Sequence, residues 1–174
     1  MNSHRYAFGL VLIAILALPL GINAQEHKPY VGSQALEKLK NLAGSWQGMI
    51  DMGQGPQPIK TSYKVTSAGS AVVETTFEGT PNEMVTIYHD DKNRKLVMTH
   101  YCGLNNQPKM VLSGQKNNTL EFNLSKDTSI DVNQEEHMHA LNVIFDSLDK
   151  IKQEWLNYSK GNTKKVVIAY ERVH

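Results

Sequence analysis

Two side chains that could do chemistry lie close together on one predicted strand. His100 and Cys102 are two positions apart in an extended segment, so they point to the same face as Leu96 and Met98. If that face is the inside, an imidazole and a thiol share an apolar environment. The pair would suit ligand binding, metal binding or a thiolate nucleophile with an imidazole base. The simpler interpretation is a small buried thiol beside a hydrogen-bonded core histidine, and we assign no catalytic residue.

A second pair of histidines lies later in the chain. His137 and His139 share one face of an extended segment, and with His100 or His89 they could hold a transition metal. The preceding residues 134–136 are strongly polar, which favours a solvated strand entrance. We therefore assign no metal ligand.

Glu74 is the only charge in the segment 72–77. If Val73 and Thr75 face inward, the carboxyl points to solvent, and we favour this register. The opposite register would bury the carboxyl, against Arg94, His100 or a polar ligand, with a raised pKa or a paired charge.

Aromatic and sulfur-containing side chains complete the candidate site. Tyrosines on strands could line a cavity, although cross-strand packing is their usual role, and Trp155 suits core packing near an open end. The candidate ligand-binding residues are Tyr63, Glu74, Tyr88, Met98, His100, Cys102 and Trp155.

Short strands must position these residues. Apolar and polar residues alternate after Gly44, and clusters rich in Gly, Asn and Asp interrupt the alternation. Ten such segments with no helix between them predict an all-β protein, an antiparallel up-and-down β-barrel. The segments are 45–52, 59–66, 71–77, 83–89, 95–102, 108–112, 119–124, 139–145, 151–158 and 165–173.

Two further segments complete the barrel prediction. A short N-terminal helix, capped by Ser33 and ended by Gly44, precedes the first strand; its leucines 36, 39 and 42 share one face. Residues 126–136 have the weakest strand signal, and we interpret them as a loop over the barrel mouth.

The N-terminal residues 1–24 are predicted to be a secretory signal peptide. Arg5 precedes an apolar run that ends in small residues, and the run is too short for a membrane span. Cleavage would leave a flexible leader, residues 25–32, and one barrel domain, residues 33–174. No later segment is long and apolar enough to span a membrane. We expect a protein exported to the periplasm or the extracellular space.

Composition excludes several classes of function. The chain has 174 residues, 18 basic and 17 acidic side chains, and a net charge of +1, which argues against a nucleic-acid partner. One cysteine excludes an internal disulfide and a multi-cysteine zinc site. Phosphate-loop, His-Glu-x-x-His and Gly-x-Ser-x-Gly motifs are absent.

The segment Gly44-Ser45-Trp46-Gln47-Gly48, followed by a meander of strands, resembles the start of calycin barrels. This group includes lipocalins, fatty-acid-binding proteins and nitrobindin-like haem barrels. A basic residue on their last strand packs over the tryptophan, and Arg172 occupies the matching place. The resemblance implies structural roles for Gly44, Trp46 and Arg172, and the contact between the last two would be a cation–π contact.

The resemblance leaves the cofactor unknown. Nitrobindin-like barrels hold haem through a histidine on a late strand, but residues 166–170 contain none, so haem would need His100 or His139. Our main expectation is an exported barrel that holds a small, largely apolar molecule in its lumen. The alternatives are an enzyme that uses His100 with Cys102 or Glu74, a haem- or metal-binding barrel, and a packed module whose loops bind a partner.

Overall fold

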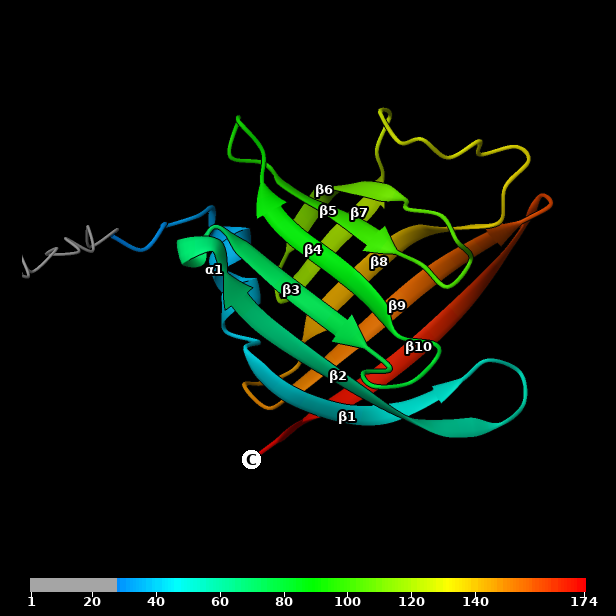
Figure 1. Ribbon diagram of the computed structural model, residues 1–174, viewed down its shortest axis with the longest axis horizontal. Helices are drawn as coiled ribbons and strands as arrows, with labels where there is room; N and C mark the ends of the chain where they lie inside the picture. The colour runs from blue at the N-terminus through cyan, green and yellow to red at the C-terminus, as the bar shows by residue number, and fades with distance from the viewer. Residues whose placement is uncertain (1–27) are drawn as a thin grey trace, which may run out of the picture.

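The computed structural model describes residues 28–174, which form a closed antiparallel barrel of ten strands after one short helix (Figure 1). Each strand pairs with its neighbours in sequence, and β1 pairs with β10 to close the sheet. The all-β, up-and-down architecture predicted from the alternation is therefore confirmed. The elements are α1 (Gln34–Lys40), β1 (Gly44–Asp51), β2 (Pro56–Thr66), η1 (Ser67–Gly69), β3 (Ala71–Thr76), β4 (Met84–Asp90), β5 (Leu96–Tyr101), β6 (Lys109–Lys116), β7 (Thr119–Leu124), β8 (His137–Phe145), β9 (Lys150–Ser159) and β10 (Asn162–Val173).

The helix α1 lies against β2, β3 and β4 at one end of the barrel (Figure 1). Ser33 caps it as predicted, because its hydroxyl accepts a hydrogen bond from the backbone N–H of Leu36. Leu36 and Leu39 are fully buried and join the barrel core. The predicted helix end at Gly44 is wrong, since the helix ends at Lys40 and a turn follows.

Gly44 and Gly48 have conformational roles in β1 instead. Gly44 has a φ of 127°, in the region that favours glycine. At Gly48, β10 comes so close that an added Cβ would lie 2.3 Å from the carbonyl oxygen of Ala169. Larger residues at either position would disturb the closure of the barrel between β1 and β10.

Trp46 and Arg172 close the same end of the barrel as α1. The Trp46 indole is buried and donates a hydrogen bond to the carbonyl of Leu42 at 2.8 Å. The Arg172 guanidinium lies 4.3 Å from the centre of the indole, so the expected cation–π contact is present. Arg172 also donates to the backbone carbonyls of Asn41 and Ala43, which ties the last strand to the end of the helix.

The opposite end of the barrel carries the hairpins β1–β2, β3–β4, β5–β6 and β9–β10, together with the long connection from β7 to β8 (Figure 1). The predicted loop 126–136 forms most of that connection, and Asn106 donates to the carbonyl of Glu136 within it. None of the helical segments in residues 28–174 has the length and apolarity needed to cross a membrane. The predicted signal peptide, residues 1–24, lies outside the described residues.

Candidate functional site

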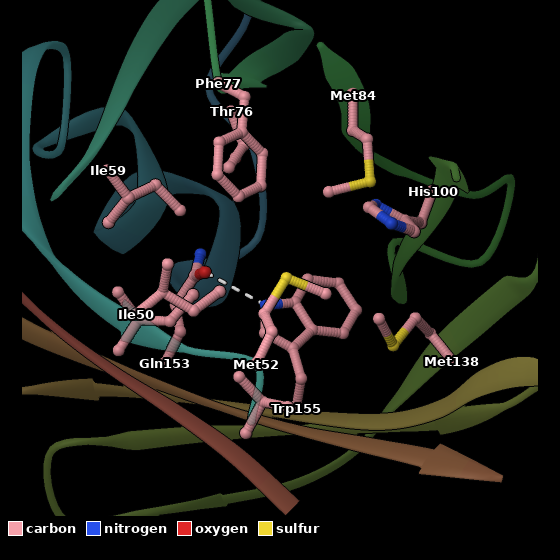
Figure 2. A pocket seen from close by; sticks show the side chains of 12 residues that line it. Ile50, Met52, Ile59, Thr76, Phe77, Met84, His100, Met138, Gln153 and Trp155 are labelled. Carbon is pink, nitrogen blue, oxygen red and sulfur yellow. Dashed lines mark hydrogen bonds between the residues drawn. The ribbon is translucent and has the colours of Figure 1, made fainter. Parts of the chain in front are cut away.

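The end of the barrel opposite α1 contains a small inner cavity and, next to it, a larger mouth. The inner cavity has a volume of about 60 Å³, and apart from Thr76, His100 and Gln153 its lining is apolar or aromatic (Figure 2). The mouth has a volume of about 750 Å³. Both spaces share five lining residues, Ile50, Met52, Phe77, Met84 and Met138. These shared residues place the two spaces next to each other, and we call the pair of spaces the funnel.

His100 is the most unusual residue of the inner cavity. It pairs directly with Thr86 across β4 and β5, and both side chains point inward. Thr86 Oγ1 lies 2.8 Å from the Nδ1 atom of His100, whereas the Nε2 atom is buried and has no hydrogen-bond partner within the described residues. Burial disfavours the imidazolium and lowers the pKa of His100 to about 4, so the ring is neutral at neutral pH.

Trp155 and Gln153 form the floor beside this histidine. The rings of Trp155 and His100 lie 4.8 Å apart at a tilt of 42°. The indole Nε1 donates to Oε1 of Gln153 at 3.0 Å, the contact drawn in Figure 2. This bond uses the polar atom of Trp155, so the indole presents an apolar surface to the cavity.

Glu74 is buried, with 1% of its surface exposed, so the predicted outward register is wrong. Its oxygens accept hydrogen bonds from Tyr88 at 2.6 Å, from Gln153 at 2.7 Å and from Thr76 at 3.3 Å. Burying a carboxyl group costs free energy, and these three hydrogen bonds offset part of that cost. They also oppose the effect of burial, which raises the pKa of Glu74 overall.

The buried network continues below the cavity. Gln153 also donates to the hydroxyl of Tyr63 at 2.8 Å, and burial raises the pKa of Tyr63 and of Tyr88 well above the ordinary value. Neither tyrosine, nor Glu74, nor the fully buried Met98 lines the inner cavity or the mouth. Of the predicted ligand-binding residues, the structure thus places only His100, Trp155 and Cys102 along the funnel.

Cys102 follows the end of β5 and lines the mouth, apart from His100 in the inner cavity. Within the described residues no hydrogen bond joins His100 to Cys102 or to Glu74. Burial raises the pKa of the thiol, and the nearby negative charge of Glu136 raises it further. This environment disfavours the thiolate that a cysteine nucleophile needs.

The histidines at the start of β8 lie outside the funnel. Nε2 of the buried His137 is 3.1 Å from Nδ1 of His139, and both rings pack against Tyr158. Neither histidine lines the inner cavity or the mouth. No group of three or more potential metal ligands occurs within residues 28–174.

The funnel does not fit haem. Nε2 of His100 is chemically able to bind iron, but the space beside it is the small inner cavity. A porphyrin also carries two propionates, and the charged residues that line the mouth, Glu83 and Glu136, are both acidic. His139, the other histidine considered, contacts His137 and lies outside both spaces.

Several residues of the funnel are not among the candidates predicted from the sequence. Met84, Met138 and Phe77 line both of its parts, and Gln153 connects the cavity to the buried carboxyl. Phe77 and Met84 flank the β3–β4 turn, and Met138 precedes a register shift in β8. The signal in the sequence that could have found them is an apolar residue at the end of a strand, where polar turn residues are expected.

No protein-family model matches this chain, and no curated protein is similar to it in sequence. The fold itself is compatible with a calycin-like barrel, because it is a closed meander of ten antiparallel strands.

Proposed function

We propose that this protein is an exported, calycin-like barrel that binds a small, largely apolar molecule at the open end of its lumen. The observation that carries the proposal is the largely apolar funnel, in which a mouth of about 750 Å³ adjoins an inner cavity of about 60 Å³. The mouth lies within the range of about 300–1,000 Å³ that is typical of small-molecule sites.

The packing of the barrel limits where a ligand can lie. Large side chains such as Trp46, Tyr88 and Phe122 are fully buried, and they occupy the lumen between α1 and the funnel. A ligand would therefore lie mostly in the mouth, with one end in the inner cavity. Methionines 52, 84 and 138 along the funnel support this interpretation, because flexible thioether side chains adapt to apolar ligands of different shape.

The proposal is tested by filling the inner cavity with a larger side chain. Val166 lines this cavity, whereas its neighbour Val167 is exposed on the outer face of β10. Val166→Trp should abolish or strongly weaken the binding of diphenylhexatriene, a hydrocarbon dye that fluoresces in apolar sites. Val167→Trp, the matched control, should bind the dye like the wild type.

Thermal melting of both variants shows whether each one folds. Absence of dye binding by the folded wild-type protein would contradict the proposal. Equal binding by the two folded variants would place the dye elsewhere and would also contradict it.

A further inference from the structure

The inner cavity contains one polar atom whose hydrogen-bonding capacity is unused. Nε2 of His100 is buried and has no hydrogen-bond partner among residues 28–174, and the residue is only 4% exposed. Buried polar atoms in folded proteins nearly always have a partner, and leaving one without a partner costs stability. An unpaired nitrogen facing a cavity is therefore a feature that a ligand would use.

Thr86 determines which nitrogen of His100 carries the proton. Within the described residues, the Thr86 hydroxyl has one hydrogen-bond partner, Nδ1 of His100. The hydroxyl is satisfied as a donor only if Nδ1 accepts its proton. The neutral ring then carries its own proton on Nε2, which presents an N–H donor to the cavity.

The charges along the funnel restrict the ligand further. Two acidic side chains, Glu83 and Glu136, line the mouth. Among the described residues, no lysine or arginine lines either the mouth or the inner cavity. A carboxylate in the inner cavity would lose its hydration without gaining a cation. A carboxylate left in the mouth would face two groups of like charge.

The geometry points to an uncharged apolar ligand that carries a carbonyl oxygen, as in a ketone or an ester, and that accepts a hydrogen bond from Nε2 of His100. This inference rests on the proposed function and names the chemical class of its ligand. Its apolar part would lie along the methionines of the mouth, and its carbonyl would enter first. Fatty-acid anions of the same length would be poor ligands.

A matched pair of competitors tests this selectivity. Decan-2-one and decanoate have the same number of carbons but differ in charge, and diphenylhexatriene has no hydrogen-bonding group. We expect decan-2-one to displace the dye from the wild-type protein at neutral pH at least about tenfold better than decanoate, because an unpaired charge is costly to bury.

Replacing the histidine tests the assignment of the donor. His100→Phe should weaken decan-2-one about five- to tenfold more than it weakens the dye, which is the value of one hydrogen bond, because the dye has no group that could accept from Nε2. His89→Phe, at an exposed histidine outside the funnel, should change neither. Thr86→Val, which keeps the His100 ring but removes the hydroxyl, should weaken decan-2-one in the same direction.

The outcomes separate the two proposals. If the dye binds but decanoate displaces it as well as decan-2-one, or if His100→Phe leaves the ketone unaffected, the inference fails and the proposed function stands. If neither the dye nor either competitor binds the folded wild-type protein, the proposed function fails and the inference fails with it.

Discussion

Thr86 and His100 face each other across strands β4 and β5, and Thr86 Oγ1 lies 2.8 Å from Nδ1 of the imidazole. This pairing turns the other ring nitrogen, Nε2, toward an apolar cavity in which no described residue bonds to it. We infer that this pair in direct register makes Nε2 of a buried histidine an N–H donor that faces the cavity.

The stability of the protein should fall in mild acid because of His100. Its pKa is about 4 in the folded protein and about 6.5 when unfolded, so the unfolded chain binds more protons between these values. The stabilisation is complete above about pH 6.5 and is lost as the pH falls to about 4, a loss of about 3 kcal/mol. His100→Phe should lack this contribution. Urea unfolding of the wild type and of His100→Phe at about pH 7 and about pH 4.5 would measure this contribution. A difference in unfolding free energy between the two proteins that is the same at both pH values would contradict the prediction.

Glu74 should have the opposite pH dependence. Burial raises its folded pKa, so the folded state retains a proton that the unfolded state has released. This stabilisation is complete below the unfolded value and is lost as the pH rises through the folded value. Glu74→Gln should therefore gain stability relative to the wild type as the pH rises above about 4.5. Urea unfolding across this pH range measures the effect, and Glu78→Gln, at an exposed residue, is the control. If the unfolding free energy changes with pH in the same way in both variants, the prediction is contradicted.

Removing Arg172 should loosen the closed end of the barrel. Arg172→Ala loses the contact with the Trp46 ring and the hydrogen bonds to Asn41 and Ala43, so we expect a loss of about 2 kcal/mol or more. Arg172→Lys keeps the charge but not the planar fork, and should recover about half of that loss. Lys150→Ala, which removes an exposed ion pair nearby, should change stability by less than about 1 kcal/mol. Equal urea midpoints for all four proteins would argue against a structural role for Arg172.

Cys102 should behave as a slow thiol that a ligand protects. Its raised pKa leaves little thiolate at neutral pH, so iodoacetamide should modify the folded protein more slowly than the urea-unfolded chain. Because the residue lines the mouth, decan-2-one should slow the reaction further. Mass spectrometry of timed samples measures both rates. Cys102→Ser should still bind decan-2-one. If the folded variant does not bind it, the thiol has a chemical role in binding and the prediction is contradicted.

The barrel could be predicted from the sequence because its strands follow a local rule. Alternation with period two, interrupted by turn residues, predicted ten strands and their order, and adjacent strands in the chain became neighbours in the sheet. The strand ends were less accurate: β8 begins at His137 and β10 at Asn162, both earlier than predicted. The ends of a hairpin are set by how far the backbone N–H and C=O groups of its two strands stay paired. The alternation of side chains does not contain this information.

The inward position of Glu74 could not be predicted from its neighbours alone. Its hydrogen-bond donors come from β3, β4 and β9, and Gln153 is 79 residues away in the chain. Only the closed barrel brings these donors together, so the local rule that charges face solvent failed at this position. The cavity could not be predicted from the sequence either, because it depends on which positions in the lumen the larger side chains leave empty.

The most direct test of the central claim is the protonation state of the His100 imidazole with and without ligand. Long-range ¹H–¹⁵N correlation spectra of the wild-type protein at neutral pH report which ring nitrogen carries the proton. We predict a neutral His100 ring protonated at Nε2, and a shift of that nitrogen when decan-2-one binds, while His89 remains unchanged. A proton on Nδ1, or an Nε2 signal that does not move when the ketone displaces the dye, would contradict the account.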